Sequence, residues 1–179
     1  QLMADVRGGE NAPGELREVP VYIGGRDSTV DSASFVPASP DYLELLLEQL
    51  FTYVRRGEYP PLVDVALTHY QFEVIHPFRD GNGRIGRLLI MLQLYAAGLL
   101  PGPYLYLSAY FRRHGEAYRE KLLAVSQSGD LTDWITFVLN AIAEQAIDAY
   151  ECGVELKALR EDYRARFSNA PTVRDLVDY

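Results

Sequence analysis

The stretch from His76 to Arg87 constrains this chain more than any other feature of its sequence. It reads His-Pro-Phe-Arg-Asp-Gly-Asn-Gly-Arg-Ile-Gly-Arg, so a base, a carboxylate and a glycine-rich turn are followed closely by two arginines. Gly81 and Gly83 allow positive φ and let backbone N–H groups approach an anion closely. A strongly helical run follows and closes at Gly98, so the turn leads into a helix N-terminus. Such an end carries unpaired N–H groups and a positive dipole end, which predicts a phosphate site.

The polar side chains of this stretch suit nucleotide chemistry. His76 can take a proton near neutral pH, as a general base must. Asp80 is a single carboxylate beside the expected phosphate site, and Mg²⁺ is usually held by one or two carboxylates plus substrate phosphates and waters. Arg84 and Arg87 share a helix face and can grip the same phosphate chain. Taken singly, these residues could equally cap helices or form surface ion pairs, so it is their combination that favours function.

The stretch also resembles the signature of the Fic (filamentation induced by cAMP) family. It matches His-x-Phe-x-(Asp/Glu)-Gly-Asn-Gly-Arg-x-x-Arg at every fixed position. The segments that precede and follow the Fic core have counterparts in residues 13–17, 21–25, 35–37, 105–108 and 129–134. The resemblance is to bacterial members that often carry an N-terminal inhibitory helix and a C-terminal winged-helix module. It implies a protein adenylyltransferase that moves AMP from ATP–Mg²⁺ to a Ser, Thr or Tyr hydroxyl of a target protein, or of itself, and releases pyrophosphate.

The resemblance assigns a role to each motif residue. His76 would deprotonate the target hydroxyl, and Asp80 would hold Mg²⁺ against the α- and β-phosphates. The residues expected to bind the ATP phosphates are Gly81, Asn82, Gly83, Arg84 and Arg87. Doc-type kinases, a related branch that transfers phosphate, carry Lys where this chain has Gly83, so AMP transfer is favoured over kinase activity.

The resemblance is weaker for the adenine and target sites. Tyr118 aligns with the first of two family tyrosines near the adenine, but Arg119 replaces the second, and ordinary packing explains Tyr118 equally well. Gln127 stands where an amide could reach the base. Ile23 and Gly24 lie in a hairpin that looks like the Fic flap, where a target peptide would add as an extra strand.

The family's inhibitory motif, (Ser/Thr)-x-x-x-Glu-(Gly/Asn), has no match among the 179 residues. Glu10 precedes Asn11, but Val6 stands where Ser or Thr is required. We therefore expect the inhibitory helix to lie on a preceding segment or on a separate antitoxin chain, contacting Arg87. An AMP-removing enzyme and an ATP-sensing module linked to a DNA-binding wing stay open as alternatives.

The pattern of hydrophobic residues predicts an all-α helical bundle with one small β-hairpin. Helices are expected from Pro40 to about residue 56 and over 61–74, 84–97, 108–127 and 132–166, and the hairpin pairs 18–23 with 33–36. Core candidates of the last helix are Trp134, Phe137, Val138, Ile142 and Ile147. The expected organisation is an N-terminal loop and flap hairpin over 1–40, a Fic core over 41–168, and over 169–179 the start of a truncated, winged-helix-like segment.

Composition and charge limit the compartments and the binding partners that the sequence favours. The net charge of −8 makes this segment a poor general binder of nucleic acid. No apolar run is long enough to cross a bilayer, and no secretory leader opens the chain. The single Cys152 cannot form an intrachain disulfide, which favours the cytoplasm, and we expect its thiol to be buried. The sequence leaves a homodimer open.

Overall fold

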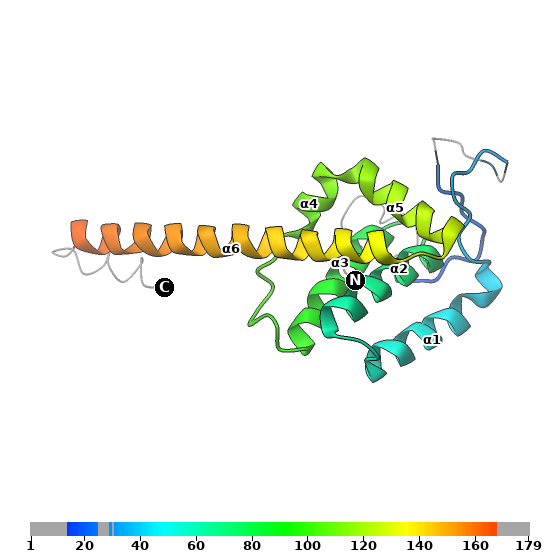
Figure 1. Ribbon diagram of the computed structural model, residues 1–179, viewed down its shortest axis with the longest axis horizontal. Coiled ribbons are helices and arrows are strands. Elements are labelled where there is room, and N and C mark those ends of the chain that lie inside the picture. The colour runs from blue at the N-terminus through cyan, green and yellow to red at the C-terminus, as the bar shows by residue number, and fades with distance from the viewer. Residues whose placement is uncertain (1–13, 25–28, 30, 168–179) are drawn as a thin grey trace.

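The computed structural model describes residues 14–24, 29 and 31–167 (Figure 1). A short 3₁₀ helix, η1 (Pro40–Tyr42), leads into the first of the α-helices that make up the described chain. They are α1 (Leu43–Arg56), α2 (Pro61–Ile75), α3 (Asn82–Ala96), α4 (Leu107–Arg113), α5 (Gly115–Ser128) and α6 (Thr132–Arg166). The all-α prediction is confirmed.

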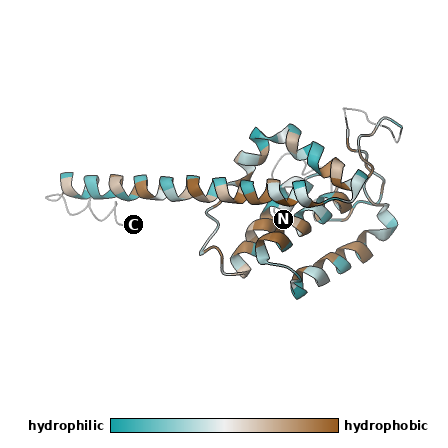
Figure 2. Cartoon of the chain, in the orientation of Figure 1, coloured by the Kyte–Doolittle hydropathy of each residue, from teal (hydrophilic) through white to brown (hydrophobic). Residues whose placement is uncertain are grey.

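Helix α2 lies at the centre of the bundle and packs against α1, α3 and α6. Apolar residues colour α2 and α3 along most of their length in Figure 2, as expected for helices covered by neighbours on several sides. Trp134 of α6 is fully buried, and its indole Nε1–H donates to the carbonyl of Ala66 at 2.8 Å. A buried tryptophan usually finds such a partner, and this one fixes α6 across α2.

A second, smaller apolar cluster joins α1 to the far end of α2. Leu43 and Leu50 of α1 are buried against Phe72 and Ile75, and the aromatic ring of Phe78 packs on the same group. Phe78 belongs to the loop after α2, so this cluster ties the loop to the core. Phe78, the apolar residue in an otherwise polar stretch, therefore has a structural role.

The expected hairpin is only partly present. Ile23 and Phe35 exchange both backbone hydrogen bonds, at 3.0 Å and 3.1 Å, in an isolated antiparallel bridge. Neither this bridge nor the rest of the described chain extends into a regular strand, which corrects the hairpin prediction. The tip of the predicted hairpin, 25–28 and 30, lies outside the described residues, as does the segment 169–179.

Two further expectations were wrong. The single helix predicted over 108–127 is two helices, because the chain bends at His114, which caps α4 and precedes α5. Ile147, a predicted core residue, is 57% exposed, and Cys152 is exposed rather than buried. Ile147 lies on the outer face of α6, because Gln145 and Ala149 on either side of it still pack against the bundle. Cys152 lies where α6 projects beyond the bundle, and every residue from 151 to 167 is exposed (Figure 1). No described helix is both long and apolar enough to cross a membrane.

Candidate active site

His76 ends α2 in a strained backbone conformation. It caps the helix with φ 50° and ψ 60°, and its N–H donates to the carbonyl of Phe72 at 2.9 Å. It is the only non-glycine residue with positive φ among those the structure describes. A left-handed residue of this kind costs free energy and tends to persist where function requires it. The turn swings the imidazole out of the helix and towards the cavity described below.

Arg17 holds the chain in this turn from behind. Its side chain is 2% exposed, and Nε donates to the carbonyl of His76 at 2.8 Å. The guanidinium also donates to the carbonyls of Ile75 at 3.3 Å and Val19 at 3.2 Å, and to that of Ala38. The end of an α-helix leaves carbonyls without intrahelical partners, and here the buried Arg17 donates hydrogen bonds to them. No role of its own was expected for Arg17 from the sequence.

Burial lowers the pKa of His76, and the positive charge of Arg17 acts in the same direction. The imidazole is therefore neutral at physiological pH. A neutral imidazole is the form that can accept a proton from a substrate hydroxyl.

The loop between α2 and α3 is closed by Asn82. Its side-chain Oδ1 accepts from the N–H of Phe78 at 2.9 Å, and its Nδ2 donates to the carbonyl of Phe78 at 2.7 Å. Asn82 is 2% exposed, so the amide that we expected to contact phosphate is engaged in the loop itself. Phosphate contacts from this residue would then come from its backbone N–H.

Helix α3 starts directly after this loop. Gly81 is its N-cap with φ 88°, a conformation that favours glycine. The first bond of the helix runs from the N–H of Ile85 to the carbonyl of Gly81 at 2.9 Å. The N–H groups of residues 82–84 therefore precede the first helix hydrogen bond, as an anion site at a helix N-terminus requires.

Asp80 and Arg84 flank this N-terminus. The Arg84 guanidinium lies 3.1 Å from the Asp80 carboxylate, and both side chains are about two-fifths exposed. The other oxygen of Asp80 accepts from the N–H of Gly81 at 2.6 Å. The described residues hold no group of three or more metal-ligating side chains. A lone accessible carboxylate fits Mg²⁺ of the kind that takes its other ligands from phosphates and water.

Arg87 lies over the first turn of α3. Its Nε donates to the hydroxyl of Ser108 on α4 at 2.9 Å. Its Nη1 lies 3.1 Å from the point where a Cβ on Gly83 would stand, so any side chain at residue 83 would crowd the guanidinium. Glycine at this place therefore keeps Arg87 and the helix N-terminus together.

Sequence reasoning missed a buried polar group behind Arg87. Glu73 is 9% exposed, and burial raises its pKa to about 7 against the opposing effects of Arg87 and of a hydrogen bond from Tyr118. The Tyr118 hydroxyl also lies 3.1 Å from Nε2 of His69, a buried residue whose pKa falls to about 3 because of burial. Glu73 lies three residues before His76, so helical spacing alone could have placed it on the same face.

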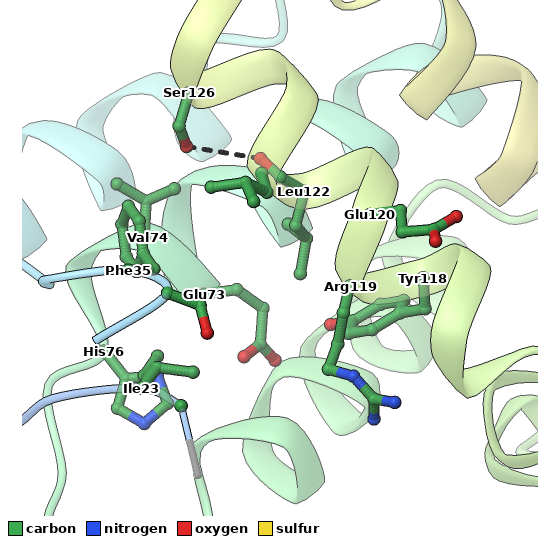
Figure 3. A pocket seen from close by; sticks show the side chains of 13 residues that line it. Ile23, Phe35, Glu73, Val74, His76, Tyr118, Arg119, Glu120, Leu122 and Ser126 are labelled. Carbon is green, nitrogen blue, oxygen red and sulfur yellow. Dashed lines mark hydrogen bonds between the residues drawn. The ribbon is translucent and has the colours of Figure 1, made fainter. Parts of the chain in front are cut away.

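A cavity of about 610 Å³ opens beside His76 (Figure 3). Ile23, Gly24 and Phe35 line one wall, and Tyr118 and Leu122 of α5 line another. Figure 3 shows the His76 imidazole on one side, Tyr118 and Arg119 on the other, and the Glu73 carboxylate directed into the space between them.

The structure thus brings His76, Ile23, Gly24 and Tyr118 to one cavity. The Tyr118 hydroxyl is engaged with His69 and Glu73, so only its ring is left for a ligand in this arrangement. Gln127 is exposed and is not among the residues that line the cavity.

Comparisons with known proteins point to one family. Residues 1–94 match the model of the Fic/DOC family. A protein adenylyltransferase Fic of Aedes aegypti is 30% identical over 140 residues, which cover 76% of this chain and 25% of that protein. One of Drosophila grimshawi is 31% identical over 140 residues, 76% of this chain and 26% of that protein. The chain therefore spans about a quarter of the length of these relatives.

Solved structures show the same fold. A Fic family protein from Desulfovibrio desulfuricans G20 superposes with a TM-score of 0.67 at 30% identity, over 78% of this chain and 42% of that one. A Fic domain containing signaling protein from Bacteroides thetaiotaomicron gives a TM-score of 0.55 at 26% identity, over 76% of this chain and 52% of that one. The family match over residues 1–94, supported by these structures and by the site around His76, shows that the chain belongs to the Fic/DOC family.

Proposed function

We propose that this chain carries the catalytic domain of a protein adenylyltransferase. It transfers AMP from ATP to a Ser, Thr or Tyr hydroxyl of a target protein, or of itself. The observation that carries the proposal is His76, held neutral at the end of α2 beside both a cavity and the α3 N-terminus. The printed names of the Aedes and Drosophila relatives support the same activity.

The proposed reaction gives each of these groups a step. His76 takes the proton of the acceptor hydroxyl, and the oxygen forms a bond to the α-phosphorus of ATP. The bond from that phosphorus to the bridging oxygen breaks, and pyrophosphate leaves with the electron pair. The N–H groups of the first turn of α3 and the guanidinium of Arg87 face the charge that develops on the phosphates, and preorganised donors of this kind are the largest source of catalysis in many enzymes.

Asp80 would hold Mg²⁺, which neutralises phosphate charge when bound. The apolar wall of the cavity fits the adenosine moiety, because planar bases pack on apolar side chains. Ile23 and Gly24 border the same cavity, and we propose that the target peptide adds beside them in extended form.

We also propose that an inhibitory segment or antitoxin acts through Arg87, since a carboxylate bound there would displace phosphate. The single free thiol of Cys152 supports a reducing compartment, and we place the protein in the cytoplasm. A homodimer and the absence of nucleic-acid partners stay predictions.

The test of the activity uses ATP labelled at two positions. Label from the α-phosphate should appear on protein, and label from the γ-phosphate should appear only in released pyrophosphate. Protein that acquires label from the γ-phosphate would instead indicate a kinase. If the protein binds ATP and acquires no label from either position, it is a nucleotide sensor and the proposal is wrong.

Asp80→Ala should remove the Mg²⁺ dependence of ATP binding. Asp80 is the carboxylate at the α3 N-terminus, and its loss leaves the ion only phosphates and water. ATP titrations with and without Mg²⁺ measure the effect. Glu161→Ala, an exposed carboxylate on the projecting part of α6, is the matched control. A Mg²⁺ response that survives in Asp80→Ala would place the ion on another residue.

A further inference from the structure

Behind the phosphate site, a carboxyl group has little contact with water and one oxygen without a partner. Glu73 is 9% exposed, and its Oε1 has no hydrogen-bond partner among the described residues. Buried polar atoms are nearly always paired, so an exception calls for an explanation. The other elements of the proposed mechanism make no use of this group.

Two glycines of α3 let Glu73 approach the phosphate-binding helix. A Cβ on Gly86 would stand 2.7 Å from Oε1 of Glu73, which is closer than atoms can pack. A Cβ on Gly83 would stand 3.9 Å from the same oxygen and 3.1 Å from Nη1 of Arg87. The carboxyl oxygen and the guanidinium therefore both lie close to the first turns of α3, where the phosphate chain of ATP would bind.

An ionised carboxyl at this place conflicts with a bound triphosphate. The phosphate chain would occupy the guanidinium of Arg87 and bring several negative charges close to Glu73. A like charge nearby, together with burial, disfavours the charged form of a carboxyl group. A protonated Glu73 removes the repulsion and can donate a hydrogen bond.

We propose that Glu73 couples nucleotide binding to proton uptake. In the absence of nucleotide it is largely ionised above neutral pH and its charge is balanced by Arg87. When the phosphate chain binds to Arg87, Glu73 takes a proton from solvent. This inference rests on the proposed function, because it places the triphosphate at the N-terminus of α3. Glu73 acts through Arg87 and is a positioning residue.

The surrounding groups leave Glu73 as the one that changes charge. The pKa of His69 is lowered to about 3 and that of His76 is lowered too, both chiefly by burial, so both rings stay neutral above pH 7. The pKa of Tyr118 is raised well above its ordinary value by burial, so its hydroxyl keeps its proton. From α5, Arg119 and Glu120 also line the cavity, and both are exposed. The pKa of Glu73 itself, about 7, lies where the linkage is measurable.

The direct test is calorimetry of ATP–Mg²⁺ binding at pH 8 in two buffers of different ionisation enthalpy. The difference between the two apparent enthalpies gives the number of protons bound. A group with a pKa of about 7 in the free protein is ionised to about 0.9 at pH 8, so uptake should approach about 0.9 proton per ATP. Glu73→Gln should abolish this uptake, and it corrects for protons that the nucleotide itself exchanges. Glu120→Gln, a carboxyl on the same cavity with an exposed side chain, should leave the uptake unchanged.

A second measurement needs no variant. The Kd of wild-type protein for ATP should rise by about tenfold per pH unit above pH 8. The kcat at saturating ATP should not show this loss, so the effect should fall on KM, which a purely structural role would not produce. Equal proton uptake by wild type and Glu73→Gln, or a Kd independent of pH, would overturn the inference. Absence of ATP binding would instead remove the proposed function and this inference with it.

Discussion

His76→Ala is expected to lower AMP transfer by at least ~10²–10⁴-fold, the usual contribution of a general base. ATP binding should stay nearly intact, because the imidazole acts on the incoming hydroxyl and the phosphates are held by α3 and Arg87. The free energy of unfolding should change little, since His76 contributes its backbone rather than its ring to the capping of α2. Transfer is measured with ATP labelled in the α-phosphate, and binding by calorimetry.

His114→Ala is the matched control for this variant. His114 is an exposed histidine between α4 and α5 whose ring lies 4.3 Å from that of Tyr110, away from the cavity. Its replacement should leave transfer unchanged within about twofold, as is usual for surface substitutions. A His76→Ala protein that keeps more than about a tenth of the wild-type rate would show that another group is the base.

The pH profile of kcat/KM should have an acid limb and an alkaline limb, each set by the titration of a different residue. The acid limb belongs to His76 and should lie below pH 6.5, the ordinary pKa of histidine, because burial lowers the pKa and keeps the ring neutral at lower pH. The alkaline limb belongs to Glu73 and should begin near pH 7, where loss of its proton opposes ATP binding. Since kcat/KM reports the free enzyme and kcat the complex, only the acid limb should remain in kcat.

The candidate site could be predicted where its residues are neighbours in sequence. His76, Asp80 and the glycines lie within one loop and one helix turn, so their spacing already fixes how they meet. Helix bounds followed from the same local signals: 132–166 was predicted and α6 is Thr132–Arg166. Their roles on a nucleotide stay predictions.

The residues that support the site could not be found this way. Ser108 reaches Arg87 from α4, and Arg17 reaches His76 across 59 residues of chain. A buried arginine that donates to backbone carbonyls leaves no sequence pattern, because every residue carries such a carbonyl. Glu73 was within reach of helical spacing, but its burial depends on Gly83 and Gly86 facing it from another helix.

Other errors came from treating apolar spacing as burial. Ile147 is 57% exposed although Gln145 and Ala149 still pack against the bundle, so it lies on the outer face of α6. Cys152 lies further along, where every residue from 151 to 167 is exposed. Periodicity shows which face of a helix is apolar, but it does not show where the neighbouring helices stop.

Arg17→Ala should lower the free energy of unfolding by about 3 kcal/mol, because it leaves several buried carbonyls without donors. For a chain of this size the melting temperature should fall by roughly 6–12 °C. The carbonyls concerned belong to Ile75, His76, Val19 and Ala38, so the loss loosens the end of α2 and two loop segments together. Arg55→Ala removes an exposed arginine on α1 that donates to the hydroxyl of Thr52 at 3.1 Å, and it should cost under about 0.5 kcal/mol.

The pH profile separates the role of Arg17 at His76 from its role in stability. Its positive charge lowers the pKa of His76, so Arg17→Ala should raise that pKa and move the acid limb of kcat/KM to higher pH. Arg17→Lys keeps the charge but loses the planar fork that serves several carbonyls at once, so it should be less stable than wild type with the acid limb unmoved. If the acid limb stays in place in Arg17→Ala while the protein remains folded, Arg17 only braces the loop, and the imidazole owes its low pKa to burial alone.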